Sequence, residues 1–76
     1  MQQEVFEVFV GNLNYSTTNE DLEDYFHKCG PIRSAKVLKG GKAFVKFETK
    51  EGVDNARKLH GQTLFNRRIF VELARN

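Results

Sequence analysis

An aromatic ring flanked by two lysines marks residues 40–47, which read GGKAFVKF. Side chains alternate between the two faces of an extended strand, so Lys42, Phe44 and Lys46 are expected to share one face. A phenylalanine ring offers a flat π surface for stacking, and lysine ammonium groups attract anions. This face therefore has the chemistry to hold a ligand that is both planar and negatively charged.

A second strand is predicted over residues 5–11, VFEVFVG, where β-branched and aromatic residues precede a polar loop. Phe6, Val8 and Val10 form the better core set, so Phe9 points the other way. On the lysine-bearing strand, the same reasoning assigns Ala43 and its alternate neighbours to the core. Phe9 and Phe44 are therefore both predicted to lie outside the core.

Two helices are predicted between the strands. Thr18 and Asp21 form a capping-box pair at the start of the first helix, which Gly30-Pro31 ends. Its inward residues are expected to be Leu22, Tyr25, Phe26 and Cys29. Thr49 is expected to cap the second helix and Gly61 to close it. Its inward residues are expected to be Val53, Ala56 and Leu59.

Three further features complete the order β-α-β-β-α-β. Residues 32–39 and 42–48 read as strands joined across Gly40-Gly41, and residues 69–74 read as the last strand. Right-handed crossovers place both helices on one side of a four-stranded antiparallel sheet with strand order 4-1-3-2. The predicted fold class is thus α+β, a ferredoxin-like sandwich, with residues 1–76 as one domain.

The hairpin across Gly40-Gly41 has two possible registers. A strict two-residue turn would pair Lys36 with Val45 and bury an unpaired charge, which is costly. We therefore expect a three-residue loop or a bulge instead. The expected positions are Ala35 and Val37 inside and Leu38 outside near Phe44.

The other face of the sheet is predicted to be open. The strand over 5–11 lies between the other two, so Phe70 should join Phe9 and Phe44 there. In the last strand, Ile69, Val71 and Leu73 alternate against Phe70 and Glu72. An exposed patch of phenylalanines has no structural reason of its own. It fits a ligand surface, or one covered by a partner protein or a C-terminal segment.

Composition narrows the function classes. With 76 residues and a net charge of +2, the chain suits one small domain, and bulk charge does not by itself indicate nucleic acid. The lone Cys29 forms no internal disulfide, and no Cys/His spacing suits zinc, so we expect a reducing intracellular compartment without cofactor or metal. His27 and His60 are not expected to be ligands. No membrane span or signal peptide is read, and the end at Asn76 is typical of a domain excised from a longer protein.

The segments VFVGNL, residues 8–13, and GGKAFVKF resemble the two ribonucleoprotein signatures of the RNA recognition motif (RRM). Gly41 and the alternating Ala-Phe-Val-x-Phe run fit the longer signature. Gly40 stands where a basic residue is usual, and Lys42 stands where an aromatic is usual. The resemblance covers essentially the whole chain and is strongest to the RRMs of SR-type splicing factors.

The resemblance implies a non-enzymatic module that binds single-stranded RNA, part of an mRNA-processing or other RNA-metabolism factor. Aromatics matching Phe9 and Phe44 stack bases in this family, and Lys42 would offer charge to phosphate instead of a ring. The predicted RNA-binding residues are Phe9, Phe44, Lys42, Lys46, Phe70, Lys39, Arg68, Arg75 and Tyr15. Tyr15 has an alternative, which is packing on a helix.

The resemblance also implies partners and a location. Single-stranded RNA is the expected partner, with other ribonucleoprotein subunits as further candidates and no membrane, and the isolated domain should be a monomer. The nucleus, the cytoplasm or an organelle would suit such a protein. Because one stacking position is replaced, the domain alone should bind weakly and depend on flanking chain for avidity.

Two other functions compete. Some RRM relatives bind a peptide through the helical side, using an acidic first helix and an Arg-x-Phe loop. Here the first helix is acidic, but the matching loop is Gln62-Thr63-Leu64, and a homodimer through the open sheet is a variant of this alternative. Small frames of this order also host acyl-phosphate hydrolysis and metal transfer, yet no Cys-x-x-Cys or catalytic constellation is present.

Overall fold

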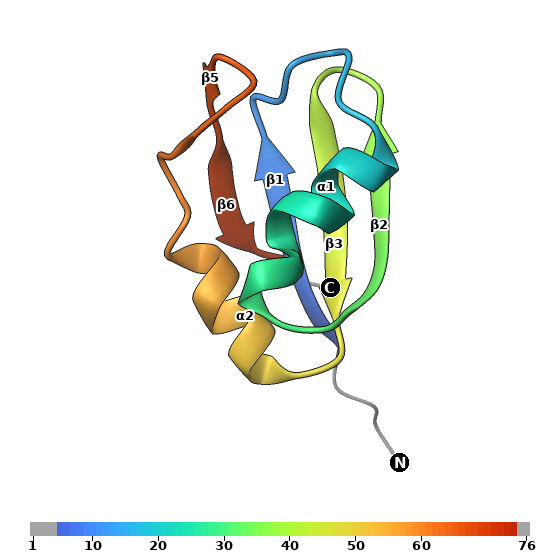
Figure 1. Cartoon of the computed structure of the whole chain (residues 1–76), viewed down its shortest axis with the longest axis vertical. Helices are drawn as coiled ribbons and strands as arrows, with labels where there is room; N and C mark the ends of the chain where they lie inside the picture. The colour runs from blue at the N-terminus through green and yellow to red at the C-terminus, as the bar shows by residue number, and fades with distance from the viewer. Residues whose placement is uncertain (1–4, 75–76) are drawn as a thin grey trace.

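The computed structural model describes residues 5–74 and shows a sheet covered on one side by two helices (Figure 1). The main strands are β1 (Phe6–Gly11), β2 (Ile32–Leu38), β3 (Lys42–Phe47) and β6 (Phe70–Leu73). The helices are α1 (Asn19–Phe26) and α2 (Lys50–Arg57), with a 3-10 turn η1 (His27–Cys29) after α1. The order β2-β3-β1-β6 confirms the predicted antiparallel sheet. Within the described part of the chain, no helix has the length and apolarity needed to cross a membrane.

The core lies between the sheet and the helices and follows the predicted alternation. β1 pairs with β3 so that Val8 faces Val45 and Val10 faces Ala43, and all four side chains are fully buried. The ring of Phe26 from α1 meets that of Phe47 from β3 edge-on, with centroids 6.5 Å apart. The buried core residues are Val8, Val10, Leu13, Leu22, Phe26, Cys29, Ala35, Ala43, Val45, Phe47, Val53, Ala56, Ile69 and Val71.

Both helices begin where the capping residues predict. The backbone N–H of Asp21 donates to Thr18 Oγ1 at 3.1 Å, and the Thr18 N–H donates to Asp21 Oδ2 at 2.9 Å. This reciprocal pair satisfies two N–H groups that a helix start leaves free. Thr49 Oγ1 accepts from the Gly52 N–H at 3.3 Å and caps α2 in the same way.

The β2–β3 hairpin has the predicted three-residue connection, residues 39–41. Leu38 pairs with Lys42, and Lys36 pairs with Phe44. Ala35 is consequently buried, and Lys36 lies on the exposed side. The register thus avoids burying a charge, as the energetic reasoning required.

Two details of the last third differ from the sequence prediction. A small hairpin, β4 (Thr63–Leu64) paired with β5 (Arg67–Arg68), precedes β6, so the two arginines do not begin the last strand as predicted. Leu73 was predicted to be inside, yet it is 41% exposed. It pairs with Val8 and so faces the helical side, but it borders a hollow between β6 and α2 that no side chain fills.

Gly52 sets the distance between α2 and β3, which yields a stability prediction. A Cβ at this position would lie 2.6 Å from a ring carbon of Phe47. Alanine favours a helix by about 1 kcal/mol over glycine, but overpacking costs about 1–3 kcal/mol. We expect Gly52→Ala to lower the free energy of unfolding by about 1–2 kcal/mol in urea titrations.

The matched control is Glu51→Ala, at the exposed position next to Gly52 in the same helix. This change should stay within about 0.5 kcal/mol of the parent chain. A Gly52→Ala protein as stable as the parent would show that α2 can move away from Phe47 at no cost.

Candidate nucleic-acid interface

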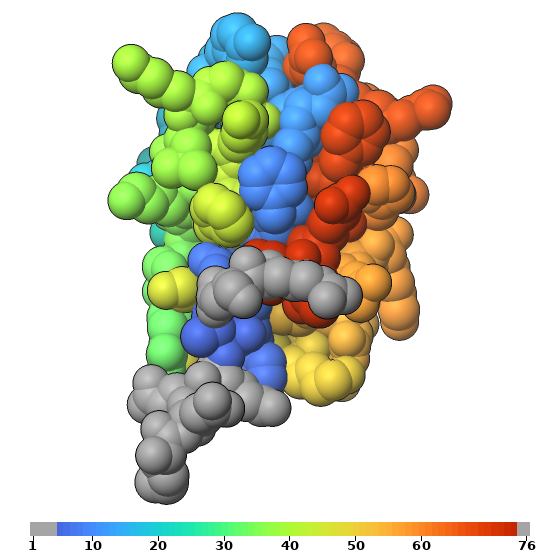
Figure 2. All heavy atoms as spheres, turned by 180° about the vertical axis from the view of Figure 1, so that it is seen from behind, coloured from blue at the N-terminus to red at the C-terminus, as the bar shows by residue number. Residues whose placement is uncertain are grey.

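Three phenylalanine rings lie together on the face of the sheet that the helices leave open. Phe9 and Phe44 are direct partners across β1 and β3, and their ring centroids are 5.5 Å apart at 62°. Phe70 extends the row on β6 and is 46% exposed. In the space-filling view, side chains of β3, β1 and β6 adjoin one another across this face (Figure 2). The predicted arrangement of the three rings is confirmed.

Gly11 makes the close approach of two of these rings possible. It pairs with Phe70 across β1 and β6. A Cβ at Gly11 would lie 3.3 Å from a ring carbon of Phe9 and 3.9 Å from one of Phe70. The two rings therefore occupy the space that a side chain would otherwise take, and the apolar surface runs without a break from β3 to β6.

Lysines border the rings on the β2–β3 side. Lys42 and Lys46 lie on the same face as Phe44, as predicted. Lys36, which the sequence interpretation did not name as a site residue, pairs directly with Phe44 from β2 and is exposed. The hairpin register contained the signal for it, because a three-residue loop places Lys36 opposite Phe44.

Carboxylates border the rings on the other side. Glu7 pairs with Lys46 across β1 and β3, and Glu72 pairs with Phe9 across β1 and β6. The charge of Lys46 is therefore partly balanced by a neighbour. Lys36 and Lys42 have no carboxylate as cross-strand partner, so they are the stronger candidates for holding an anion.

The loop after β1 is tied to the β4–β5 hairpin at one end of the sheet. Asn12, with a φ of 60°, donates from Nδ2 to the Arg68 carbonyl at 2.7 Å. Arg67 donates to both the Oδ1 and the carbonyl of Asn12, at 2.6 and 3.2 Å. Arg67 is thus engaged in joining two loops, whereas the neighbouring Arg68 side chain is exposed.

The remaining predicted site residues lie at the same end or outside the described range. Lys39 is exposed in the β2–β3 connection. Tyr15 is 82% exposed, so its predicted alternative of packing on a helix is wrong. A Cβ on Gly41 would lie 3.2 Å from its ring, which puts Tyr15 beside the β2–β3 connection. Arg75 lies outside the described residues.

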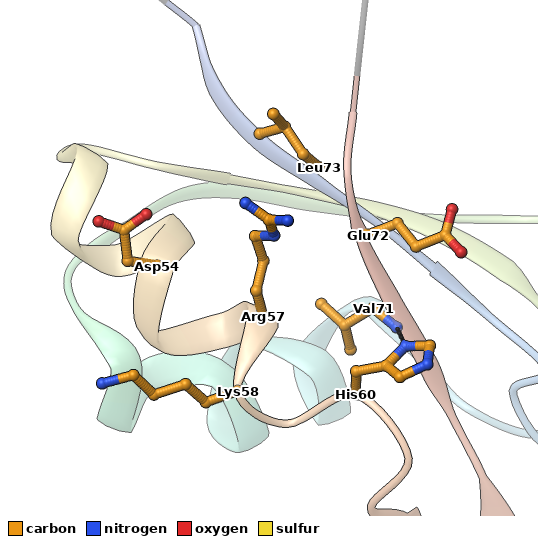
Figure 3. A pocket seen from close by; sticks show the side chains of 7 residues that line it. All are labelled: Asp54, Arg57, Lys58, His60, Val71, Glu72 and Leu73. Atoms are coloured by element: carbon orange, nitrogen blue, oxygen red, sulfur yellow. Dashed lines mark hydrogen bonds between the residues drawn. The ribbon is translucent and has the colours of Figure 1, made fainter.

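His60 supports the edge of the row of rings, a role that the sequence did not reveal. Its Nδ1 accepts the Val71 N–H at 3.0 Å (Figure 3), and its ring centroid lies 5.8 Å from that of Phe70. The imidazole thus satisfies an edge-strand donor that points away from β1 and lies against the outermost ring. Hydrogen bonds between segments this far from regular helix or strand patterns leave no sequence periodicity to read.

Titratable groups on the helical side have structural roles. Burial raises the pKa of the Cys29 thiol, and burial followed by the charge of Cys29 raises the pKa of Tyr25. Lys28 lies over the Tyr25 ring, 4.5 Å from its centroid. Among residues 5–74, no three His, Cys, Asp or Glu side chains gather closely enough to hold a metal ion.

Comparison with known proteins agrees with this geometry. The profile of the RNA recognition motif matches residues 8–69. Glycine-rich RNA-binding protein 5, mitochondrial, from Arabidopsis thaliana is 39% identical over 74 residues, which cover 88% of this chain and 26% of that protein. Human serine/arginine-rich splicing factor 3 is 41% identical over 70 residues, 88% of this chain and 43% of that protein.

Solved structures give the same result. A Sex-lethal protein/RNA complex matches with a TM-score of 0.83 and 31% identity, covering 96% of this chain and 48% of that one. The fold and the open face with its rings and lysines define an RNA-binding module of the ferredoxin-like class. The chain belongs to the RNA recognition motif family, and it spans less than half the length of the two relatives described above.

The two roles of His60 can be separated by substitution. His60→Ala removes the acceptor of the Val71 N–H and should lower the free energy of unfolding by about 1–2 kcal/mol. His60→Asn offers Oδ1 near the position of Nδ1 and should recover most of this loss, although it lacks the ring. Urea titration, with hydrogen exchange at the Val71 amide, measures both effects. Equal losses in the two variants would mean that the ring contact, and not the hydrogen bond, holds this edge.

Proposed function

We propose that this domain is a non-enzymatic module that binds single-stranded RNA across the open face of its sheet. The observation that carries the proposal is the pair of rings, Phe9 and Phe44, held side by side on a face the helices do not cover. A folded domain gains nothing from exposed rings of this size, whereas every nucleobase has a flat face that can stack on them.

Each group on the face has a role in this proposal. Bases stack on Phe9 and Phe44, and Phe70 offers a third ring at the β6 side. Lys36, Lys42 and Lys46 attract phosphates on the β2–β3 side. Stacking is tolerant of sequence, so the preference for particular bases should be modest.

The relatives support a role in RNA metabolism. Two of them are an RNA-binding protein and a serine/arginine-rich splicing factor by name, and one structural neighbour is a complex with RNA. We infer an intracellular protein that acts in mRNA processing or another RNA pathway, with this domain as a monomeric unit of a longer chain. Other ribonucleoprotein subunits would be its protein partners.

Removal of one ring tests the proposal most directly. One stacked base is worth about 1–3 kcal/mol, so Phe44→Ala should weaken binding of a short mixed-sequence RNA by roughly 5-fold to 150-fold. The parent domain should bind with a Kd of about 1 μM or weaker, since a single small domain lacks avidity. NMR titration, following the amides around Phe9, Phe44 and Lys46, measures both the affinity and the surface.

The matched control is Leu73→Ala, which removes an exposed apolar side chain from the helical side of the sheet. It should leave RNA affinity unchanged. Shifts confined to the helices, or no shifts at all, would contradict the proposal and favour the alternative of a protein-binding or dimerising domain. Sedimentation without RNA would then show whether the open face joins two copies.

Salt dependence tests the proposed role of the lysines. If about three phosphates are neutralised, log K should fall with log salt at a slope of about −2. Lys36→Gln should flatten this slope by about 0.7, because one phosphate contact is lost. The control is Lys58→Gln, an exposed lysine beside the hollow on the helical side. Fluorescence anisotropy at four salt concentrations gives the slopes, and equal slopes for all three proteins would remove Lys36 from the interface.

A further inference from the structure

Three connections meet at one end of the sheet and form what we term the loop end, residues 12–18, 39–41 and 62–68. The Leu13 N–H donates to the Gly41 carbonyl at 2.9 Å, which joins the first connection to the second. The bonds between Asn12 and the two arginines join the first to the β4–β5 hairpin. Figure 1 shows all three connections gathered beyond the same end of β1 and β3.

Phe65 stands at the tip of this hairpin in a conformation that does not suit it. Phe65 and Asn66 form the two-residue turn, with φ angles of 49° and 67°. Asparagine and glycine tolerate such angles, but a bulky side chain with a Cβ is disfavoured there. The ring is also 47% exposed, so burial offers little compensation. Neither the turn nor the core explains a phenylalanine at this position.

The Phe65 position is nevertheless held firmly. Asn14 Nδ2 donates to the Phe65 carbonyl at 3.3 Å, and the Asn12 bonds secure the strand that follows the turn. The amide of Asn14 itself is placed by a tight polar turn, because its Oδ1 accepts from the Ser16 N–H at 3.0 Å. A ring presented from a backbone fixed in this way loses little freedom when it binds a ligand.

The charge of this end is of one sign. Residues 11–18, 38–42 and 62–70 contain four basic side chains, Lys39, Lys42, Arg67 and Arg68, and no aspartate or glutamate. The whole chain carries a net charge of only +2, so the positive charge is concentrated here. Exposed aromatic rings, Phe65 and Tyr15, lie in the same segments. Rings among unopposed cations suit a polyanion that also carries planar groups.

The loop end is continuous with the row of rings on the sheet. Gly11, which faces Phe70, directly precedes Asn12, whose side chain bonds the Arg68 carbonyl two residues before Phe70. In Figure 2 the connection after β1 and the β4–β5 hairpin crowd the edge of the open face next to the sheet side chains. A ligand lying across the three sheet rings would therefore reach the loop end without crossing an acidic surface.

We propose that the loop end extends the RNA interface and takes nucleotides beyond those stacked on the sheet. Phe65 stacks one base, and Arg68 and Lys39 contact the adjoining phosphates. This inference rests on the proposed function, because the sheet must hold the first nucleotides. It assigns a contact to Phe65, which neither the family signatures nor the sheet geometry includes.

The test compares two RNA lengths with the substitution Phe65→Asn. Asparagine suits the left-handed turn, so this variant should melt at the same temperature as the parent or higher. Its affinity for an oligonucleotide of about four nucleotides, enough for the sheet, should be unchanged. Its affinity for one of about nine nucleotides should fall by about fivefold or more, because one stacked base is lost.

Two further variants complete the design. Phe65→Tyr keeps the ring and should bind both lengths as the parent does. Val5→Asn removes an apolar side chain of equal exposure, 47%, at the opposite end of β1, and should also leave both affinities unchanged.

The outcomes separate this inference from the proposed function. If Phe65→Asn binds both lengths as the parent does, or loses affinity for both equally, the extension is wrong while the sheet still binds RNA. If its only effect is on an acidic protein segment, the loop end serves a protein and the inference is overturned. If the parent binds neither length, both proposals fail. A Phe65→Asn protein that melts earlier than the parent would show that the turn needs the phenylalanine, which also overturns the inference.

Discussion

The pairing of β1 with β3 is the constraint on which the whole molecule depends. The register that sets Val8 against Val45 and Val10 against Ala43 gives the helices a dry surface to cover. The same register makes Phe9 and Phe44 partners on the reverse side. Since side chains alternate strictly, a slip of one residue would exchange the two faces, expose the valines and bury the lysines. Core and candidate interface are therefore two consequences of one set of backbone hydrogen bonds.

The exposed rings are accommodated by contacts among themselves. Edge-to-face pairs such as Phe9 and Phe44 stabilise each other by about 0.5–1.5 kcal/mol beyond the area that they bury. The absence of a side chain at Gly11 lets Phe9 and Phe70 approach over the strand, and His60 lies against the outer ring. These contacts hold the rings in place without covering their faces. The surface is therefore organised before any ligand arrives, which lowers the ordering cost of binding.

The sequence predicted the parts of the fold that have a period or a cap. The alternation in β1 and β3, the capping box at Thr18 and Asp21 and the charge of Lys36 led to the sheet order, the helix starts and the hairpin register. The β4–β5 hairpin was missed because two-residue strands are too short to show alternation, and its turn carries Phe65 where asparagine or glycine would have been recognised. Leu73 has the right alternation but lies on an edge strand, where the helix no longer covers it. The link between His60 and Val71 joins a loop to a strand edge, and no local pattern announces it.

The missing aromatic at Lys42 changes where a ligand can be held. In the family signature a ring at this position would add stacking surface on β3, but here β3 offers a single outward ring flanked by lysines. The rings continue instead over Gly11 to Phe70 on β6, and the lysines occupy β2 and β3. Glu7 and Glu72 stand on β1 and β6 and repel phosphate on that side. Stacking and charge are thus displaced in opposite directions across the sheet. A single strand of RNA on this face would place its bases toward β6 and its phosphates toward β2, with the lysines gripping one side of the chain while the rings hold the other.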